Sequence, residues 1–280
     1  MKDIDIKTII ETVERLCMEA NYFLGDDITE GLKKGLKSEE SETGRQILQC
    51  IIQNARLAGE EKIAICQDTG MAVLFVEIGQ EVHISGGCLT DAINEGVRRG
   101  YKHGYLRQSV VIDPLDRKNT GDNTPAVIHY DIVPGDELKI TVAPKGFGSE
   151  NMSALKMLKP SDGVEGVKAF ILNTVDKAGP NPCPPVIVGV GLGGTMEKAA
   201  FLAKKALLRP INLGSSHEHI RELEKEVLAG INRLGIGPMG LGGRTTALAV
   251  NIEVFPTHIA GLPVAVNIGC HVTRHAQAIL

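Results

Sequence analysis

Three cysteines limit most strongly how this chain of 280 residues can fold, because each stands where an apolar strand meets a turn. Their surroundings are AICQDTGMAV around Cys66, NPCPPVIVG around Cys183 and VNIGCHVTRHA around Cys270. Turn-forming Pro, Gly or Asp flanks all three. The positions lie far apart along the chain and no C-x-x-C pair occurs, so only the tertiary fold can bring these thiols together.

The residues alone leave several roles open for these thiols. They could be small buried core residues, half of a redox pair, or ligands of one shared metal. Three thiolates with His258, His271 or His275 as a fourth ligand suit zinc. Three thiolates on a four-iron cluster would instead leave one iron without a protein ligand, and an open position is what makes a metal site reactive.

Two of the other cysteines, Cys17 and Cys88, are predicted to be structural. Cys17 lies on the apolar stripe of an N-terminal helix, Cys50 lies beside a second such stripe, and Cys88 lies at an expected helix start. In a reducing compartment these six cysteines are not expected to form structural disulfides.

Composition and charge exclude several function classes. The net charge is −4 without a long basic run, and aromatic residues make up only 4%, which argues against nucleic-acid binding. No apolar run reaches the roughly 18 residues that a membrane span needs. The start, MKDIDIKTIIETVERL, is acidic and amphipathic and lacks the layout of a secretion or organelle signal. We therefore expect a cytoplasmic protein.

The hydrophobic pattern predicts a mixed α/β (α+β) fold with a helical N-terminal lobe. Helical periodicity covers 4–22, 28–37 and 42–57, and strands and helices intermix after Lys62. IAIC and MAVLFVEIG are predicted as strands, and IHYDIVPGDELKITVAP as a hairpin. Further helices are expected near 164–178, 195–208 and 216–234, followed by two strands. We describe the chain as one domain, 1–280, with 1–60 as its lobe.

Two glycine-rich runs resemble nucleotide-binding loops at first sight. GVGLGG follows an apolar run and opens a helix, but no acidic residue ends a following strand, so a tight strand-to-helix turn is the favoured interpretation. GPMGLGGRTT has Pro238 where a phosphate loop needs Gly and Arg244 where it needs Lys. Such a glycine-rich backbone can instead hold anions through its N–H groups.

Several motifs together resemble one family, the class I, iron–sulfur-dependent fumarases, which also include L-tartrate dehydratase. The resemblance runs from about residue 10 to the C-terminus and implies the alpha subunit of the two-chain form. It depends on six segments in the family's order: CQDTG, LRQSVVIDP, APKGFGSENMS, NPCPPVIVGVGLGGT, GPMGLGGRTTALAV and FPTHIAGLPVAVNIGCHVTRHA.

The resemblance implies that Cys66, Cys183 and Cys270 are the ligands of a [4Fe–4S] cluster. An open iron would bind the substrate's hydroxyl and one carboxylate. By the same resemblance Gln67 and Asp68 reach the substrate and the bound hydroxyl. This role is chemically reasonable for Asp68, since a carboxylate beside such an iron can orient a bound hydroxyl. Without the family match, Asp68 would be expected to cap a turn.

The remaining site residues are also implied by the family. Arg107 would fork onto a substrate carboxylate, although a surface ion pair is the simpler interpretation. His258 would act as the active-site histidine, although it could be a satisfied histidine between strands. Gly146 and Gly148 would offer backbone N–H groups to the substrate. The family usually has a glycine between these two, and here it is Phe147.

The family places the proton-abstracting residue on a beta subunit, so the chain is expected to work in an α₂β₂ hetero-oligomer. The favoured activity is reversible hydration of fumarate to L-malate, with L-tartrate dehydration as the alternative. An NAD-dependent oxidoreductase and a zinc-stabilised interaction module are the rivals from other classes. Lys145 and Arg244 are weaker candidates for supporting the site from behind.

Overall fold

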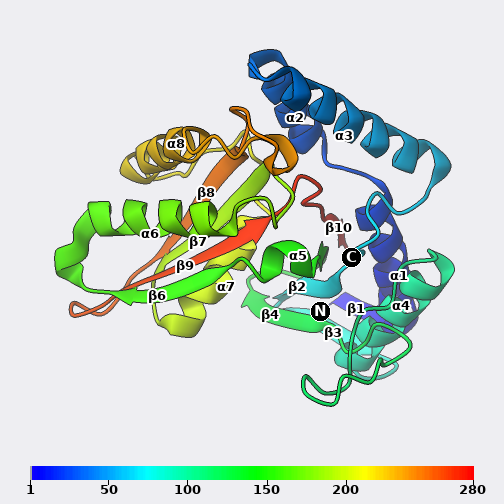
Figure 1. Ribbon diagram of the computed structural model, residues 1–280. Helices are drawn as coiled ribbons and strands as arrows, with labels where there is room; N and C mark the ends of the chain where they lie inside the picture. The colour runs from blue at the N-terminus through cyan, green and yellow to red at the C-terminus, as the bar shows by residue number, and fades with distance from the viewer. Residues whose placement is uncertain (1) are drawn as a thin grey trace. The chain divides into compact units, whose positions relative to one another are not determined.

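The computed structural model describes residues 2–280, and its helices and strands confirm the mixed α/β fold class (Figure 1). The chain forms two compact units, each built from separated parts of the sequence. Unit 1 combines Met1–Leu24, Ala55–Phe147 and Arg274–Leu280, and unit 2 combines Gly25–Asn54 and Gly148–Thr273. No helix within residues 2–280 is both long enough and apolar enough for a membrane crossing.

A four-stranded sheet in the order β10-β5-β2-β4 forms the centre of unit 1. β2 lies in the interior and pairs parallel with β4 and antiparallel with β5, while β10 pairs antiparallel with β5. The central strands are rich in Val, Ile, Leu and Phe, as expected for strands that are buried. The strands are β2 (Met71–Gly79), β4 (Val127–Val133), β5 (Leu138–Lys145) and β10 (Ala276–Ile279).

Unit 1 also contains the first helix of the chain. β1 (Lys2–Asp5) pairs parallel with β3 (Val82–Ser85) and leads directly into α1 (Ile6–Tyr22). The helix begins at Asp5, whose Oδ1 accepts the Lys7 N–H at 2.8 Å and so satisfies one of the open N–H groups of the first turn. The apolar stripe predicted from the sequence is buried, and its fully buried members are Ile9, Val13, Leu16, Cys17 and Ala20.

α4 (Leu89–His103) packs closely against α1 because two glycines face it. A Cβ added at Gly96 would lie 2.6 Å from the Cβ of Val13, and one added at Gly100 would lie 2.7 Å from the Cβ of Cys17. Both distances are shorter than any ordinary carbon contact, so only glycine allows this separation of the helices. Cys17 is fully buried in this core, which confirms its predicted structural role.

The predicted hairpin around Pro134 is wrong. Its two strands are present as β4 and β5, but β2 lies between them in the sheet and pairs with both. The turn passes the end of β2 instead, where the Gly79 N–H donates to the Glu137 carbonyl at 2.8 Å. A hairpin and a crossing over one strand share the same local turn signal, so the sequence could not separate them.

The predicted strand IAIC is also absent. Residues 63–70 form bends and extended chain before β2, and their carbonyl groups bind side chains rather than a neighbouring strand. The Ile65 N–H donates to the Asn21 carbonyl at the end of α1 (3.0 Å). A short apolar run often indicates only that its side chains are buried and does not identify a strand. Here the side chain of Ile65 is buried in a loop.

A second four-stranded sheet forms unit 2, in the order β6-β9-β7-β8. β7 pairs parallel with β8 and antiparallel with β9, and β6 pairs antiparallel with β9 at the edge. The strands are β6 (Ala154–Leu158), β7 (Val186–Gly193), β8 (Ala247–Phe255) and β9 (Leu262–Gly269).

Helices cover both faces of this sheet, as Figure 1 shows. The larger core lies beneath α6 (Gly163–Ala178) and α8 (Glu218–Asn232), whose apolar stripes pack on alternate residues of β7, β8 and β9. α7 (Met196–Ala206) covers the opposite face through Ala199 and Ala203. The remaining helices are α2 (Asp26–Ser38), α3 (Glu42–Glu61), the short α5 (Phe147–Glu150) and the 3-10 turns η1 (Pro160–Asp162) and η2 (Pro238–Gly240).

The GVGLGG run serves helix–sheet packing. Gly189 and Gly191 lie within β7 and face α7, where an added Cβ would come within 2.2 Å of the Ala203 carbonyl oxygen and 1.9 Å of the Ala199 carbonyl oxygen. These glycines therefore permit close approach of α7, which explains them without a bound dinucleotide. The strand-to-helix turn favoured from the sequence is confirmed.

The three N-terminal helices predicted from the sequence are present, but they contribute to different units. α1 belongs to unit 1, whereas α2 and most of α3 belong to unit 2. The description of 1–280 as one domain with a lobe at 1–60 stays a prediction.

Candidate functional site

The CQDTG segment, residues 66–70, leads into β2 as a loop held by side chains of unit 1. The Tyr101 hydroxyl donates to the carbonyls of Thr69 (2.8 Å) and Gly70 (3.2 Å), and the Asn123 amide donates to the Gly70 carbonyl at 3.2 Å. Burial raises the pKa of Tyr101 far above its ordinary value, so this hydroxyl keeps its proton and stays a donor. The loop therefore has a fixed backbone.

Gly70 must be glycine for two reasons. Its φ of +72° lies in the left-handed region, and an added Cβ would lie 2.7 Å from the backbone nitrogen of Lys145. Within the loop, Thr69 and Gly70 are buried, Cys66 is half-buried and Gln67 is exposed. Gln67, directly after Cys66, is thus exposed while the end of the loop is anchored.

Asp68 joins two of the predicted site segments. Its Oδ1 accepts the Gly70 N–H at 3.0 Å, and its Oδ2 accepts the Phe147 N–H at 2.9 Å. A Cβ added at Gly146 would lie only 3.0 Å from Oδ2, so the glycine lets the KGFG backbone reach the carboxylate. The structure therefore brings Asp68 and Gly146 together, and the turn cap expected without the family match is present as well.

The departure at Phe147 adds a side chain but leaves the backbone donor as a glycine would supply it. Its N–H is the donor to Asp68, while its side chain is 48% exposed. Lys145, a weak candidate from the sequence, is buried, and its Nζ donates to the Gly146 carbonyl at 3.3 Å. Lys145 and Phe147, the two neighbours of Gly146, thus both form hydrogen bonds that hold the backbone around it.

Arg107 is tied to the same loop through its backbone, since its carbonyl accepts the Thr69 hydroxyl at 2.9 Å. Its side chain is exposed, and within residues 2–280 it forms no ion pair. The surface ion pair considered from the sequence is therefore absent from the described part of the chain. An uncompensated guanidinium remains available for a carboxylate from outside.

A buried arginine that the sequence analysis did not single out also holds this loop. Nη2 of Arg274 donates to the carbonyl of Asp68 and to Oδ1 of Asn21, both at 3.0 Å. Arg274 lies in the VTRHA stretch four positions after Cys270, which was the only sequence signal for it.

Unit 2 brings the segments of the other two cysteines together. β7 and β9 are paired with Ile187 opposite Gly269, so the loops carrying Cys183 and Cys270 leave the same end of the sheet. The Cys183 carbonyl accepts the His271 backbone N–H at 3.4 Å and lies 2.8 Å from His271 Nδ1. Cys183 has a φ of +54°, an uncommon value for a residue with a side chain.

Both cysteines are half-buried at the ends of their loops. The Cys270 carbonyl accepts both the N–H (2.9 Å) and the hydroxyl (2.8 Å) of Thr273, which closes the turn after β9. Each of the six cysteines lies in the described part of the chain, and none of them forms a disulfide.

His258 and Gly148 lie elsewhere in unit 2. His258 is exposed in the connection between β8 and β9, where its Nδ1 accepts the Ala260 N–H at 3.2 Å. Its position between strands matches the simpler interpretation in part, but its exposure does not. Gly148 lies in α5, and an added Cβ would meet only the Asn181 carbonyl oxygen at 3.7 Å, an ordinary contact. The hydrogen bonds of the described residues do not join His258 to another predicted site residue.

The donor chemistry of the three cysteines fits a thiolate-bound group. Cys66 belongs to unit 1, and Cys183 and Cys270 belong to unit 2. All three are half-buried in hydrogen-bonded loops, whereas burial raises the pKa of the Cys17 thiol and makes it a poor ligand. Among residues 2–280, no three His, Cys, Asp or Glu side chains are grouped around one ion position.

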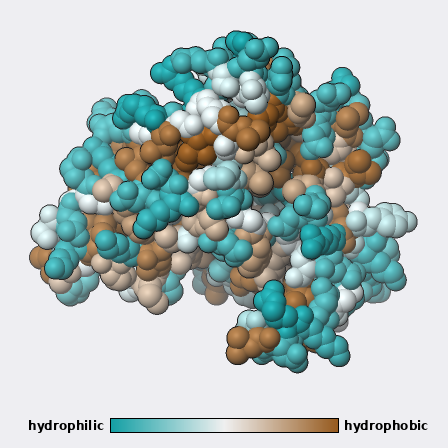
Figure 2. All heavy atoms as spheres, in the orientation of Figure 1, coloured by the Kyte–Doolittle hydropathy of each residue, from teal (hydrophilic) through white to brown (hydrophobic). Residues whose placement is uncertain are grey.

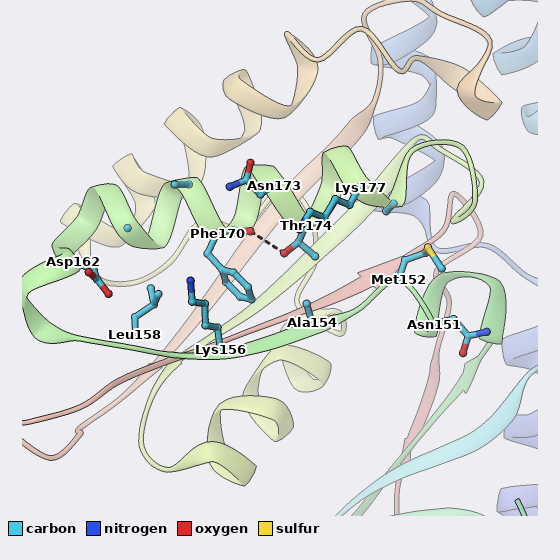
Figure 3. A pocket seen from close by; sticks show the side chains of 13 residues that line it. Asn151, Met152, Ala154, Lys156, Leu158, Asp162, Phe170, Asn173, Thr174 and Lys177 are labelled. Carbon is cyan, nitrogen blue, oxygen red and sulfur yellow. Dashed lines mark hydrogen bonds between the residues drawn. The ribbon is translucent and has the colours of Figure 1, made fainter.

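A cavity of about 620 Å³ lies within unit 2 between α6 and β6 (Figure 3). Phe170 and Leu158 line its apolar wall, and Lys156 reaches in from β6. The Thr174 hydroxyl faces it but already donates to the Phe170 carbonyl at 2.8 Å. None of the site residues predicted from the sequence lines this described cavity, so it is separate from the predicted site.

Comparisons with known proteins agree with one another. The model of the family described as fumarate hydratase (Fumerase) matches residues 10–279. The "Putative L(+)-tartrate dehydratase subunit alpha" of Methanocaldococcus jannaschii is 46% identical over 274 residues, which cover 96% of each chain. The L(+)-tartrate dehydratase subunit alpha of Escherichia coli O157:H7 is 34% identical over 279 residues, covering 98% of this chain and 91% of the relative. Its counterpart in Escherichia coli strain K12 is 33% identical over the same shares.

Proposed function

This chain belongs to the family of class I, iron–sulfur-dependent fumarate hydratases and L(+)-tartrate dehydratase alpha subunits, and on that premise we propose that it is the alpha subunit of an L(+)-tartrate dehydratase. The single observation that supports this substrate is the set of named relatives, which match nearly the whole chain and share that name. The preference for fumarate expressed from the sequence therefore gives way to its stated alternative. Fumarate hydratase is the second candidate, because the family model carries that description.

Three cysteines would hold the cofactor. We assign the ligands of a [4Fe–4S] cluster to Cys66, Cys183 and Cys270, supported by their half-burial, their loop positions and the pairing of the last two segments. When bound, such a cluster supplies an open Lewis-acidic iron that polarises a substrate hydroxyl. The NAD-dependent alternative loses its support, because the glycines on which it depended are occupied by packing against α7.

Asp68 would orient the hydroxyl of the substrate. Its two N–H donors, from Gly70 and Phe147, fix the plane of the carboxylate. A carboxylate has about four acceptor positions, so two remain for a substrate hydroxyl or water. Gln67, exposed beside it, would offer an amide to the same ligand.

Carboxylate recognition would depend on Arg107 and the glycine backbone. The exposed guanidinium of Arg107 can grip one carboxylate with two parallel hydrogen bonds, while its carbonyl stays fixed to Thr69. We further propose that Gly146 and Gly148 present N–H groups to the substrate. His258 would hydrogen-bond the substrate or a neighbouring acid.

A beta subunit would complete the pocket. His258 lies in an exposed stretch together with Phe255 at 48% and Ile259 at 91% exposure, apolar surface that a partner subunit could cover. Figure 2 shows hydrophobic residues gathered in patches among the hydrophilic ones on the visible face. We propose an α₂β₂ assembly in the cytoplasm, in which the beta subunit covers part of this apolar surface and supplies further contacts to the substrate.

The cofactor assignment is tested by metal analysis of the full chain purified without oxygen. We expect about four iron and four acid-labile sulfide per chain. Cys183→Ser should lose both, whereas Cys50→Ser, a matched change at an exposed cysteine, should retain both. Full iron and sulfide in the Cys183 variant would refute the ligand assignment, and zinc without sulfide would favour the interaction module.

The substrate is tested by the activity of the assembled alpha and beta subunits. We expect kcat/KM for L(+)-tartrate dehydration to exceed that for fumarate hydration by about 100-fold. Asp68→Asn should lower kcat by about 100-fold or more while the chain still binds its cluster. A ratio reversed in favour of fumarate would return the assignment to fumarate hydratase.

A further inference from the structure

We infer that Arg274 is a positioning residue that fixes the direction of the Asp68 carboxylate from behind the loop. The inference rests on the proposed function, since it concerns the same site. Arg274 is only 5% exposed, and its Nη2 hydrogen-bonds two residues of the same unit, Asn21 and Asp68.

The guanidinium connects α1 to the loop after Cys66. Its Nη2 donates to the Asn21 side-chain oxygen on one side and to the Asp68 carbonyl on the other, each at 3.0 Å. Asn21 is fully buried, and its own amide donates to the Cys17 carbonyl at 2.9 Å within α1. The Asp68 carbonyl is therefore anchored to the rigid core between α1 and α4.

This bond completes the restraint of the Asp68 peptide. The carboxylate is held by the N–H groups of Gly70 and Phe147, and the next carbonyl, that of Thr69, is held by Tyr101. The Asp68 carbonyl itself is held by Arg274. Without this bond the peptide between residues 68 and 69 could rotate, and the carboxylate would turn with it.

The residue type suits this task. A guanidinium is planar, permanently charged and carries several donors, so one nitrogen can serve two acceptors in a fixed geometry. The ammonium group of a lysine has no planar donor arrangement and lies at the end of a flexible side chain, so it would hold the two acceptors less rigidly. Arg274 also begins the segment of unit 1 that follows Cys270 along the chain, so one side chain anchors both this segment and the loop after Cys66.

A purely structural role is the alternative, because removing a buried arginine can loosen a whole unit. The two roles differ in where the loosening occurs. A positioning role predicts a local effect at the amides bound to Asp68, while the sheet stays intact. A structural role predicts a general effect that reaches the sheet, for example the paired residues Leu74 and Val142.

The test is amide hydrogen exchange on the full chain with Arg274→Gln and Arg274→Lys. We expect Arg274→Gln to speed exchange at Gly70 and Phe147 at least tenfold and to leave Leu74 unchanged. Arg274→Lys should give a smaller increase at the same two amides. The matched control is Arg98→Gln, which removes an exposed arginine of the same unit and should change neither.

Kinetics of the assembled enzyme give the second measurement. Arg274→Gln should lower kcat about tenfold or more while KM changes less than about threefold, because the carboxylate is misdirected but substrate contacts remain. Unchanged exchange at Gly70 and Phe147, or equal acceleration at Leu74, would overturn the inference. If Arg274→Gln does not fold, Arg274→Lys decides by the same criteria.

These outcomes stay separate from those of the proposed function. Exchange is measured without substrate, so it decides the positioning role even if the assembled wild-type enzyme acts on neither L(+)-tartrate nor fumarate. In that case the proposed function fails, while faster amide exchange confined to Gly70 and Phe147 still supports the positioning role of Arg274.

Discussion

Replacing Glu39 by Gln should destabilise unit 2, and the loss should depend on pH. The Glu39 carboxylate is 3% exposed at the turn between α2 and α3 and accepts four backbone N–H groups. Those of Glu40 and Ser41 are local, at 3.0 Å each, and those of Arg244 and Thr245 come from the glycine-rich loop before β8, the closest at 2.7 Å. Burial opposes ionisation, but these N–H groups outweigh it and lower the pKa of Glu39 from 4.5 to about 2.

The sign and size of the effect follow from this pKa. A group whose pKa is lowered on folding stabilises the fold above its unfolded value, and the contribution is lost as the pH falls toward the folded value. The shift corresponds to about 3 kcal/mol at pH 7 and roughly half of that at pH 3. Since a Gln carbonyl oxygen can still accept some of these N–H groups, we expect Glu39→Gln to lose about 2–3 kcal/mol at pH 7.

The assay is urea unfolding followed by circular dichroism, at pH 7 and pH 3 and at equal ionic strength. The control is Glu40→Gln, the same change one residue on, where the exposed side chain pairs with the Arg244 guanidinium. An exposed pair of this kind contributes about 0–1 kcal/mol. All four tyrosines lie in unit 1, so tyrosine fluorescence follows that unit separately from unit 2.

Two results would refute this reasoning. Equal stability of Glu39→Gln and wild type at pH 7 would show that the N–H groups find other partners at no cost. A loss of the same size at pH 3 and pH 7 would show that packing, rather than the charge of the carboxylate, is responsible.

The remaining predictions concern unit 1. Gly70→Ala should lower the free energy of unfolding by about 2 kcal/mol or more, because the Cβ meets the neighbouring backbone, whereas Gly135→Ala, with no described atom within 4 Å, should cost only about 1 kcal/mol; thermal unfolding measures both. Cys17 should resist alkylation by iodoacetamide in the folded chain while exposed Cys50 reacts within the same sample, as peptide mass spectrometry would show; equal labelling would contradict the burial of Cys17. Tyr101→Phe should leave the absorbance titration below pH 12 unchanged, since burial raises the pKa of this phenol beyond that range.

The sequence was informative wherever one segment decides its own structure. The helices now seen as α1, α6 and α8 were expected from the sequence within a few residues of their bounds, and the buried stripe of α1 includes Ile9, Val13 and Leu16, as its periodicity predicted. The strand β2 was also evident, but its partners were not. Its position between β4 and β5 depends on which distant strands fit beside it, and a local turn signal at Pro134 carries no information on that choice.

The candidate site shows the same division between local and distant information. The turn at Asp68 could be predicted from its own neighbours, because Asp-Thr-Gly is a turn sequence. The second bond of Asp68, to Phe147, joins residues 79 positions apart, and only the family resemblance suggested that the two segments meet. Tyr101 and Arg274 were missed because their hydrogen-bond partners lie far away in the sequence. The residues next to them in the chain give no indication of these partners.

The glycine-rich loop before β8 shows why a correct local prediction can still mislead about function. The sequence indicated that its backbone N–H groups could hold an anion, and they do, since those of Arg244 and Thr245 bind a carboxylate. The carboxylate is that of Glu39, 205 positions from Arg244, and the side chain packs so closely that a Cβ at Gly243 would lie 2.7 Å from Oε1. An anion site occupied by the chain itself is closed to phosphate. The loop therefore fastens α2 to β8. Arg107, by contrast, is exposed and pairs with no described carboxylate, which is why we propose it, rather than this loop, for the substrate carboxylate.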